Sequence, residues 1–163
     1  MSKLALHKIY TADSENLYAV ARQFFQDYQV ELGVDLSFQD FDQELQDLTR
    51  LYGPPSGTLL LLEDLEDHRF AGCVAFKRLQ EGICEMKRLY VHPDYRAKQY
   101  GKELARALID QAKAFNYREM WLDTLDRLIP AIRLYERLGF ERMEAYYPNP
   151  NKGVVYMRKI LYM

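Results

Sequence analysis

Residues 83–115 read ICEMKRLYVHPDYRAKQYGKELARALIDQAKAF, and this stretch decides the fold. Its first nine residues predict a β-strand, because apolar and β-branched side chains recur after Gly82. Pro93 ends the strand, since proline donates no backbone hydrogen bond and biases the preceding residue away from helix. From Tyr100 the apolar positions follow helical spacing, at Leu104, Leu108, Ala112 and Phe115. The segment is therefore predicted to form a strand, a tight loop and a helix.

The loop before this helix is strongly basic. Arg96, Lys98 and Lys102 crowd a helix start whose free N–H groups already carry partial positive charge. A phosphate there would accept those N–H groups and neutralise the cations, and Gly101 would let the backbone approach it closely. We therefore predict an anion-binding site; the alternative is a solvated basic turn.

Two motifs resemble the GNAT superfamily of N-acetyltransferases. Residues 91–102, VHPDYRAKQYGK, resemble its acyl-CoA pyrophosphate loop, whose signature is Arg or Gln, two residues, Gly, one residue, then Gly or Ala. Arg96 and Gly101 match the outer positions, whereas Gln99 replaces the first glycine. Residues 131–140, AIRLYERLGF, resemble the family's later helix and the start of the next strand.

The resemblance implies a binding site for acetyl-CoA. In the family, the strand before the loop diverges from its parallel neighbour and pairs with pantetheine, so the Leu89 N–H would hold the thioester oxygen and Val91 would pair with the pantetheine arm. Leu128 stands where the family often has an asparagine that contacts the cofactor. The residues expected to bind acetyl-CoA are Leu89, Tyr90, Val91, Arg96, Ala97, Lys98, Gln99, Tyr100, Gly101 and Lys102.

The resemblance also implies two catalytic residues. Glu85 matches the general base of several family members, and desolvation on an apolar strand would raise its pKa toward that role. Its alternative is a surface or ion-paired glutamate beside Lys87 or Arg88. Tyr135 matches the tyrosine that protonates the departing thiolate, and a phenol can donate to a thiolate; otherwise it is a core residue.

Composition favours one soluble domain. The chain has 163 residues, and its 48% hydrophobic content suffices for one core, so we expect a single GNAT-like domain over residues 1–163. The formal net charge of −2 gives no indication of a nucleic acid or anionic membrane as partner. No apolar run approaches the roughly 20 residues that span a bilayer. We expect a cytoplasmic protein, and members of this family are often dimers.

The remaining pattern predicts a mixed α/β fold with a central sheet of six to seven strands and about four helices. Strands are expected at 4–10, 58–62, 70–79, 119–125, 140–145 and 153–161, beside that at 83–91. Helices are expected at about 14–33, 38–51 and 130–139. Short turns make residues 58–91 antiparallel, and the helix after Gly101 makes 119–125 parallel to 83–91.

The sequence lacks the motifs of several other classes of enzyme. Arg96 and Glu103 occupy positions that a phosphate-binding Walker loop fills with Gly and Ser or Thr, and neither GxGxxG nor GxSxG occurs. The three histidines lack metal-ligand spacing, so no metal is expected.

Cys73 lies opposite roughly Leu89 if the hairpin pairs as predicted, some five residues from Cys84, so no disulfide is expected. A thiol within a strand is usually a core residue, although Cys84 could serve as a nucleophile.

Three functions fit these observations. The first is an N-acetyltransferase that moves the acetyl group of acetyl-CoA to a small primary amine, amino-acid-like or polyamine-like, by direct transfer in a ternary complex. The second is a non-catalytic acyl-CoA-binding or sensing module, motivated by Gln99 and Leu128. The third is an acetyltransferase of protein N-termini or lysines, which needs an open groove between the first two helices and residues 146–151.

Overall fold

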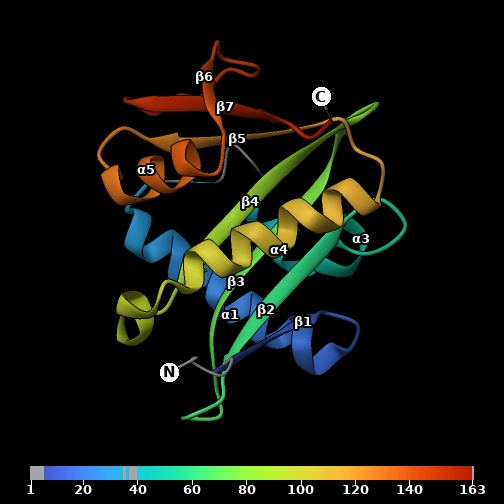
Figure 1. Ribbon diagram of the computed structural model, residues 1–163, viewed down its shortest axis with the longest axis vertical. Helices are drawn as coiled ribbons and strands as arrows, with labels where there is room; N and C mark the ends of the chain where they lie inside the picture. Colours follow the sequence, from blue (N-terminus) through green and yellow to red (C-terminus); the bar gives the residue numbers. More distant parts are fainter. Residues whose placement is uncertain (1–5, 35, 37–39, 163) are drawn as a thin grey trace.

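A seven-stranded sheet runs through the centre of the computed structural model, which describes residues 6–34, 36 and 40–162 (Figure 1). The strand order is β1-β2-β3-β4-β5-β7-β6. The strands span His7–Thr11 (β1), Thr58–Asp64 (β2), Arg69–Gln80 (β3), Ile83–Val91 (β4), Glu119–Leu125 (β5), Glu141–Met143 (β6) and Val154–Ile160 (β7). The predicted mixed sheet is confirmed: β1 to β4 are antiparallel, β4 and β5 are parallel, and β7 is antiparallel to β5 and β6.

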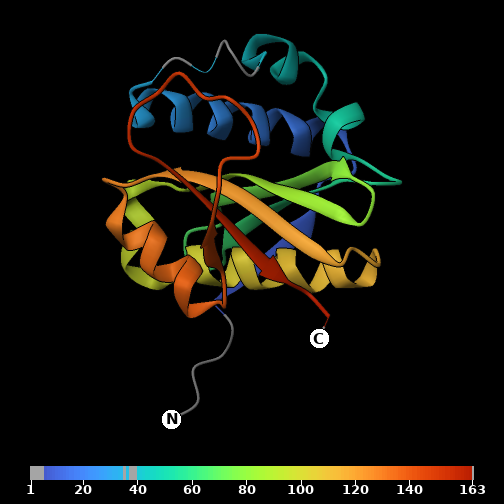
Figure 2. The ribbon, with the colours of Figure 1, turned by 90° about the horizontal axis from the view of Figure 1, so that it is seen from above.

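Helices cover both faces of the sheet (Figure 2). One face carries α1 (Glu15–Leu32), α2 (Phe41–Gln46) and α3 (Leu48–Tyr52), and the other carries α4 (Tyr100–Ala114) and α5 (Ile129–Arg137). A 3₁₀ helix, Pro93–Lys98, precedes α4. The segment between β6 and β7 crosses to the face of α1 (Figure 2).

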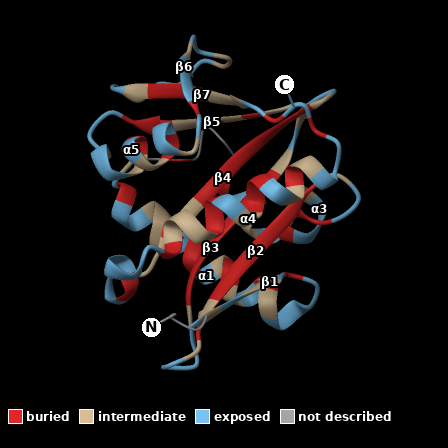
Figure 3. Ribbon diagram, in the orientation of Figure 1, coloured by how far each residue is buried: buried red, intermediate tan, exposed pale blue. Residues whose placement is uncertain are grey.

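The core lies on both sides of the central strands (Figure 3). Leu60 and Leu62 of β2 face the α4 layer, while Leu59 and Leu61 face the α1 layer, and all four are fully buried. A strand buried on both faces explains the continuous apolar run, which would alternate with polar residues if one face met water.

Two predicted elements differ from the structure. The helix expected at 38–51 is divided into α2 and α3 at Asp47, whose backbone leaves the helical region at φ −119° and whose carboxylate accepts hydrogen bonds from Gln43 and Arg50. Its expected start at Phe38, like the expected strand start at Leu4, lies outside the described residues. The strand expected at 140–145 is reduced to the three residues of β6.

The two cysteines are free and buried, as predicted. Cys73 lies opposite Tyr90 rather than Leu89, because β4 contains an extra residue, and Cys84 lies opposite Arg78. Burial raises the pKa of the Cys84 thiol to about 12, so this group is neutral near pH 7 and poorly suited to act as a nucleophile. Among the described helices, none has the length and apolar character needed to cross a bilayer.

Candidate active site

The two parallel strands at the centre of the sheet separate after a short paired segment. β4 and β5 pair only from Ile83 opposite Glu119 to Glu85 opposite Trp121. Beyond Glu85 the two strands continue without ladder pairs, which leaves backbone groups of β4 facing a gap. Such a row of backbone groups can pair with an extended ligand as if it were another strand.

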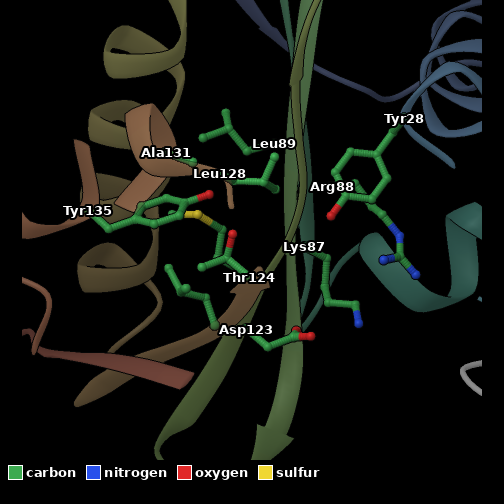
Figure 4. A pocket seen from close by; sticks show the side chains of 11 residues that line it. Tyr28, Lys87, Arg88, Leu89, Asp123, Thr124, Leu128, Ala131 and Tyr135 are labelled. Atoms are coloured by element: carbon green, nitrogen blue, oxygen red, sulfur yellow. The ribbon is translucent and has the colours of Figure 1, made fainter. Parts of the chain in front are cut away.

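A β-bulge in β4 shapes one side of this gap. The register with β3 shifts between Cys73 and Ala75, and Arg88 adopts a positive φ of 63°. The extra residue lets Lys87 and Arg88, although consecutive, leave the strand on the side of α1 and α2 (Figure 4). Bulges of this kind commonly re-aim side chains beside functional sites.

Arg88 is held in a buried ion pair with Glu44 of α2. Its guanidinium donates two hydrogen bonds, 2.8 and 2.9 Å long, to the two carboxylate oxygens. Burial alone would raise the pKa of Glu44, but the adjacent Arg88 outweighs it and holds this pKa below its ordinary value. The pair therefore fixes α2 against the sheet as one wall of the site.

A cavity of about 60 Å³ lies in the gap between β4 and β5. Leu89 and Thr124 line it from the two strands, and Leu128, Ala131 and Tyr135 line it from the start and body of α5 (Figure 4). Lys87, Arg88 and Asp123 supply its charged lining, and Tyr28 of α1 closes the α1 side. The cavity thus joins the two faces of the sheet.

Tyr135 reaches this cavity from α5, as its proposed role requires (Figure 4). Its ring packs edge-on against Phe140, with ring centroids 5.7 Å apart. Burial raises the pKa of Tyr135 well above its ordinary value. The phenol therefore keeps its proton at physiological pH and can act as a donor, but it also serves as a core residue.

A larger groove of about 940 Å³ opens from the same gap. Tyr28, Leu89, Leu128 and Ala131 line both spaces, so the groove and the cavity adjoin. The groove then follows Tyr90 and Val91 to the start of α4 at Gln99, Gly101 and Lys102. Its basic residues are Arg96, Lys102, Arg106, Arg127 and Arg137, and its acidic residue is Glu31. An elongated, phosphorylated thioester carrier fits such a groove, with apolar walls beside β4 and cations near the helix start.

The structure separates the three cations of the basic loop. Arg96 and Lys102 line the groove, whereas the Lys98 ammonium lies 2.9 Å from Asp64 and 3.4 Å from Glu66, at the β2–β3 turn. The Tyr100 hydroxyl also donates to Asp64, at 2.6 Å. Of the residues expected to bind acetyl-CoA, Ala97, Lys98 and Tyr100 are not part of the groove lining, and the other seven are.

Arg96 is itself engaged in a contact across the groove. Its guanidinium lies 2.6 Å from Glu31 of α1, and its Nε donates to the Val91 carbonyl at 2.9 Å. A diphosphate would compete with Glu31 for this cation.

Gln99 and Gly101 show why the loop favours glycine. Gln99 caps α4 with φ 61° and ψ 27°, the left-handed conformation in which glycine is least strained. A Cβ placed on Gly101 would meet Leu134 and Val91 at 3.8 Å, an ordinary contact distance. It would nevertheless project into the groove. Position 99 therefore favours glycine because of its backbone conformation. Position 101 favours glycine only when a ligand lies against the backbone there.

Glu85 lies beside the gap but does not line the cavity. The residue is 4% exposed, and its carboxylate accepts a 2.6 Å hydrogen bond from the Tyr146 hydroxyl. The Lys87 ammonium lies 3.9 Å away. Glu85 is therefore buried and ion-paired with Lys87, which is the alternative considered from the sequence, and its role as a base stays a prediction. The Tyr146 ring packs at a tilt of 55° against Trp121 of β5, with ring centroids 5.0 Å apart, and Tyr146 covers this carboxylate from the β6–β7 segment.

Sequence reasoning missed Asp123 as a site residue. It lies on β5, lines the cavity, and accepts a 2.7 Å hydrogen bond from the Tyr147 hydroxyl. An acidic residue in the interior of the predicted EMWLDTL strand was the available signal. Tyr146 and Tyr147 of the Asn/Pro-rich segment were another signal. The Tyr146 hydroxyl donates to Glu85, and the Tyr147 hydroxyl donates to Asp123.

Comparison with known proteins agrees with the geometry. The model of the acetyltransferase (GNAT) family matches residues 14–140. An N-acetyltransferase of Schizosaccharomyces pombe is 46% identical over 138 residues, which cover 84% of each chain. Zebrafish N-acetylaspartate synthetase is 30% identical over 112 residues, or 68% of this chain and 40% of that protein. A GNAT acetyltransferase of Staphylococcus aureus superposes with a TM-score of 0.80 over 96% of this chain and 99% of that one, at 20% identity.

The chain belongs to the acetyltransferase (GNAT) family. It is an acetyl-CoA-dependent N-acetyltransferase, an acyltransferase of the EC 2.3.1 type. Within the described residues, no group of three or more His, Cys, Asp or Glu side chains is arranged to hold a metal ion.

Proposed function

We propose that the enzyme transfers the acetyl group directly to a small primary amine, amino-acid-like or polyamine-like, bound on the α1 and α2 side of the gap. The observation that carries this proposal is the connection between the groove and the cavity where β4 and β5 diverge. A thioester carrier in the groove and an amine on the opposite face could then meet at Leu89 in a ternary complex.

The residue roles follow from this placement. The Leu89 N–H would donate to the thioester oxygen, and Val91 would pair with the pantetheine arm. Arg96, Gln99, Gly101 and Lys102 would hold the diphosphate at the start of α4. The amine attacks the thioester carbon, a C–N bond forms, the C–S bond breaks, and Tyr135 protonates the departing sulfur.

The amine must lose a proton before it attacks. Glu85 is proposed as the base, acting through the Tyr146 hydroxyl or a water, because Tyr146 lies directly on its carboxylate. The overall reaction converts an ammonium and a thioester to an amide, a thiol and one released proton, so the atoms and charges balance.

Two observations favour a small acceptor. The β6–β7 segment closes over the acceptor side through the contacts of Tyr146 with Glu85 and of Tyr147 with Asp123, whereas a protein substrate needs an open groove there. The relative named N-acetylaspartate synthetase also supports an amino-acid-like acceptor.

A thiol-release assay tests the proposal. The purified protein is mixed with acetyl-CoA and, separately, with amino acids, monoamines, polyamines and peptides, and the products are identified by mass. We expect thiol release and N-acetylation with at least one small amine. Acetylation of peptides alone would assign the enzyme to protein substrates instead, and binding of acetyl-CoA without release for any amine would indicate an acyl-CoA-binding module.

A further inference from the structure

Side chains of opposite charge from neighbouring strands line the cavity. Lys87 leaves β4 at the bulge, and Asp123 leaves β5 on the other side of the gap (Figure 4). Lys87 is 7% exposed, so its charge acts where water screens it poorly. A ligand in this cavity therefore meets a cation and an anion together.

Two other charged groups lie near Lys87 and Asp123, namely Arg88 and Glu85. Arg88 is the third charged residue of the cavity lining, and Glu44 already neutralises it through two hydrogen bonds. Glu85 lies 3.9 Å from the Lys87 ammonium, and so balances that charge from the covered side. A ligand carboxylate would add a second negative charge beside the Lys87 ammonium, on the cavity side.

Asp123 is oriented for the complementary task. The Tyr147 hydroxyl donates to one of its oxygens at 2.7 Å. A carboxylate has about four acceptor sites, which leaves capacity for an ammonium. The same hydrogen bond fixes the orientation of the carboxylate.

We propose that Lys87 and Asp123 bind the acceptor as a zwitterionic α-amino acid, with Lys87 on its carboxylate and Asp123 on its ammonium. This inference rests on the proposed function and selects among its acceptors. An α-amino acid carries both charges on one carbon, so one ligand can meet Lys87 and Asp123 together. A polyamine would bring a second cation toward Lys87, where like charges repel strongly. A peptide N-terminus lacks the adjacent carboxylate.

Matched substrates test the inference on the wild-type enzyme. For several side chains, kcat/KM is measured for the amino acid, its α-carboxamide and its decarboxylated amine, each corrected for its fraction of free amine. We expect the free acid to be preferred by about 10- to 100-fold, the range of a charge-assisted contact. Equal or better use of the amide, the plain amine or a polyamine would overturn the inference while leaving the enzyme a small-amine acetyltransferase. If no acceptor in the panel releases thiol, the proposed function itself fails.

Two variants test whether Lys87 and Asp123 produce the preference for the free amino acid. Lys87→Met should reduce the preference for the acid over the amide to about one, and Asp123→Asn should raise KM for the amino acid while keeping that preference. Thermal unfolding shows whether each variant folds. A folded Lys87→Met enzyme that keeps the full preference would remove Lys87 from the site, and the wild-type comparison decides the substrate class if the variant does not fold.

Discussion

The Tyr146 hydroxyl donates a 2.6 Å hydrogen bond to the carboxylate of Glu85, so the β6–β7 segment places a proton carrier on the proposed base. If protons leave the amine through this hydroxyl, Glu85→Gln and Tyr146→Phe should lower kcat alike at neutral pH. General-base catalysis contributes about 10²- to 10⁴-fold, so a fall of at least 10²-fold is expected for each. Both losses should shrink at high pH, where the amine arrives deprotonated.

Rate profiles from pH 6 to 10 check this relay. The double variant should be no slower than the slower single variant, because both act on one proton transfer. A pH-independent response to Glu85→Gln would mean that Glu85 serves only as the counter-ion of Lys87. A normal rate for Tyr146→Phe would leave water as the carrier.

Tyr135→Phe tests the proton donor of the departing thiolate. We expect kcat to fall by about 10²-fold with little change in KM for acetyl-CoA, because phenylalanine keeps the packing against Phe140 and removes only the hydroxyl. Burial raises the pKa of Tyr135, so its proton persists above the ordinary value near 10, and its ionisation should not limit the wild-type rate up to that pH. Steady-state kinetics against both substrates measure these effects, and an unchanged kcat would return Tyr135 to a purely structural role.

Lys102 and Lys98 form a matched pair in the same basic loop. Lys102 lines the groove, whereas Lys98 is held by Asp64 and Glu66 at the β2–β3 turn. Lys102→Gln should weaken acetyl-CoA binding several-fold, and more strongly at low salt. Lys98→Gln should leave that affinity unchanged and lower stability only slightly, since the ammonium is partly exposed and water screens its ion pairs. Calorimetric titration of each variant with acetyl-CoA separates the two, and an equal loss would show that Lys98 also contacts the ligand.

The sequence predicts the order of strands and helices because the apolar periods and turn residues are local signals. It predicts that Arg96 and Gly101 lie together in the groove and that Tyr135 lies in the adjoining cavity, because the two motifs carry these positions. It does not predict that Lys98 turns toward Asp64, because that choice depends on a hairpin more than thirty residues earlier in the chain. Nor does it reveal Asp123, whose environment is made by a bulge in another strand and by the β6–β7 segment.

Gln99→Gly and Gly101→Ala separate conformational cost from ligand contact at the start of α4. Gln99 adopts a left-handed backbone conformation, so glycine there should raise the free energy of unfolding by up to about 1 kcal/mol and preserve acetyl-CoA binding. Alanine at Gly101 makes only ordinary contacts within the protein, so stability should be kept while the added methyl group weakens acetyl-CoA binding. Urea unfolding and ligand titration measure both variants. Unchanged affinity of Gly101→Ala would mean that the diphosphate does not approach this backbone.

Asp64 should make stability depend on pH. Burial alone would raise its pKa, but the Tyr100 hydroxyl, the Lys98 ammonium and the Asp67 N–H hold the pKa of this carboxyl below its usual range. A carboxyl with a depressed folded pKa stabilises the protein above its unfolded pKa of about 3.9, and this contribution is lost as pH falls toward the folded value. Asp64→Asn should therefore cost about 1–3 kcal/mol at pH 7, and the difference from wild type should narrow below about pH 4. Urea unfolding between pH 2.5 and 7 measures this difference. A constant difference across the range would show that the loss comes from packing rather than from the ionised carboxylate.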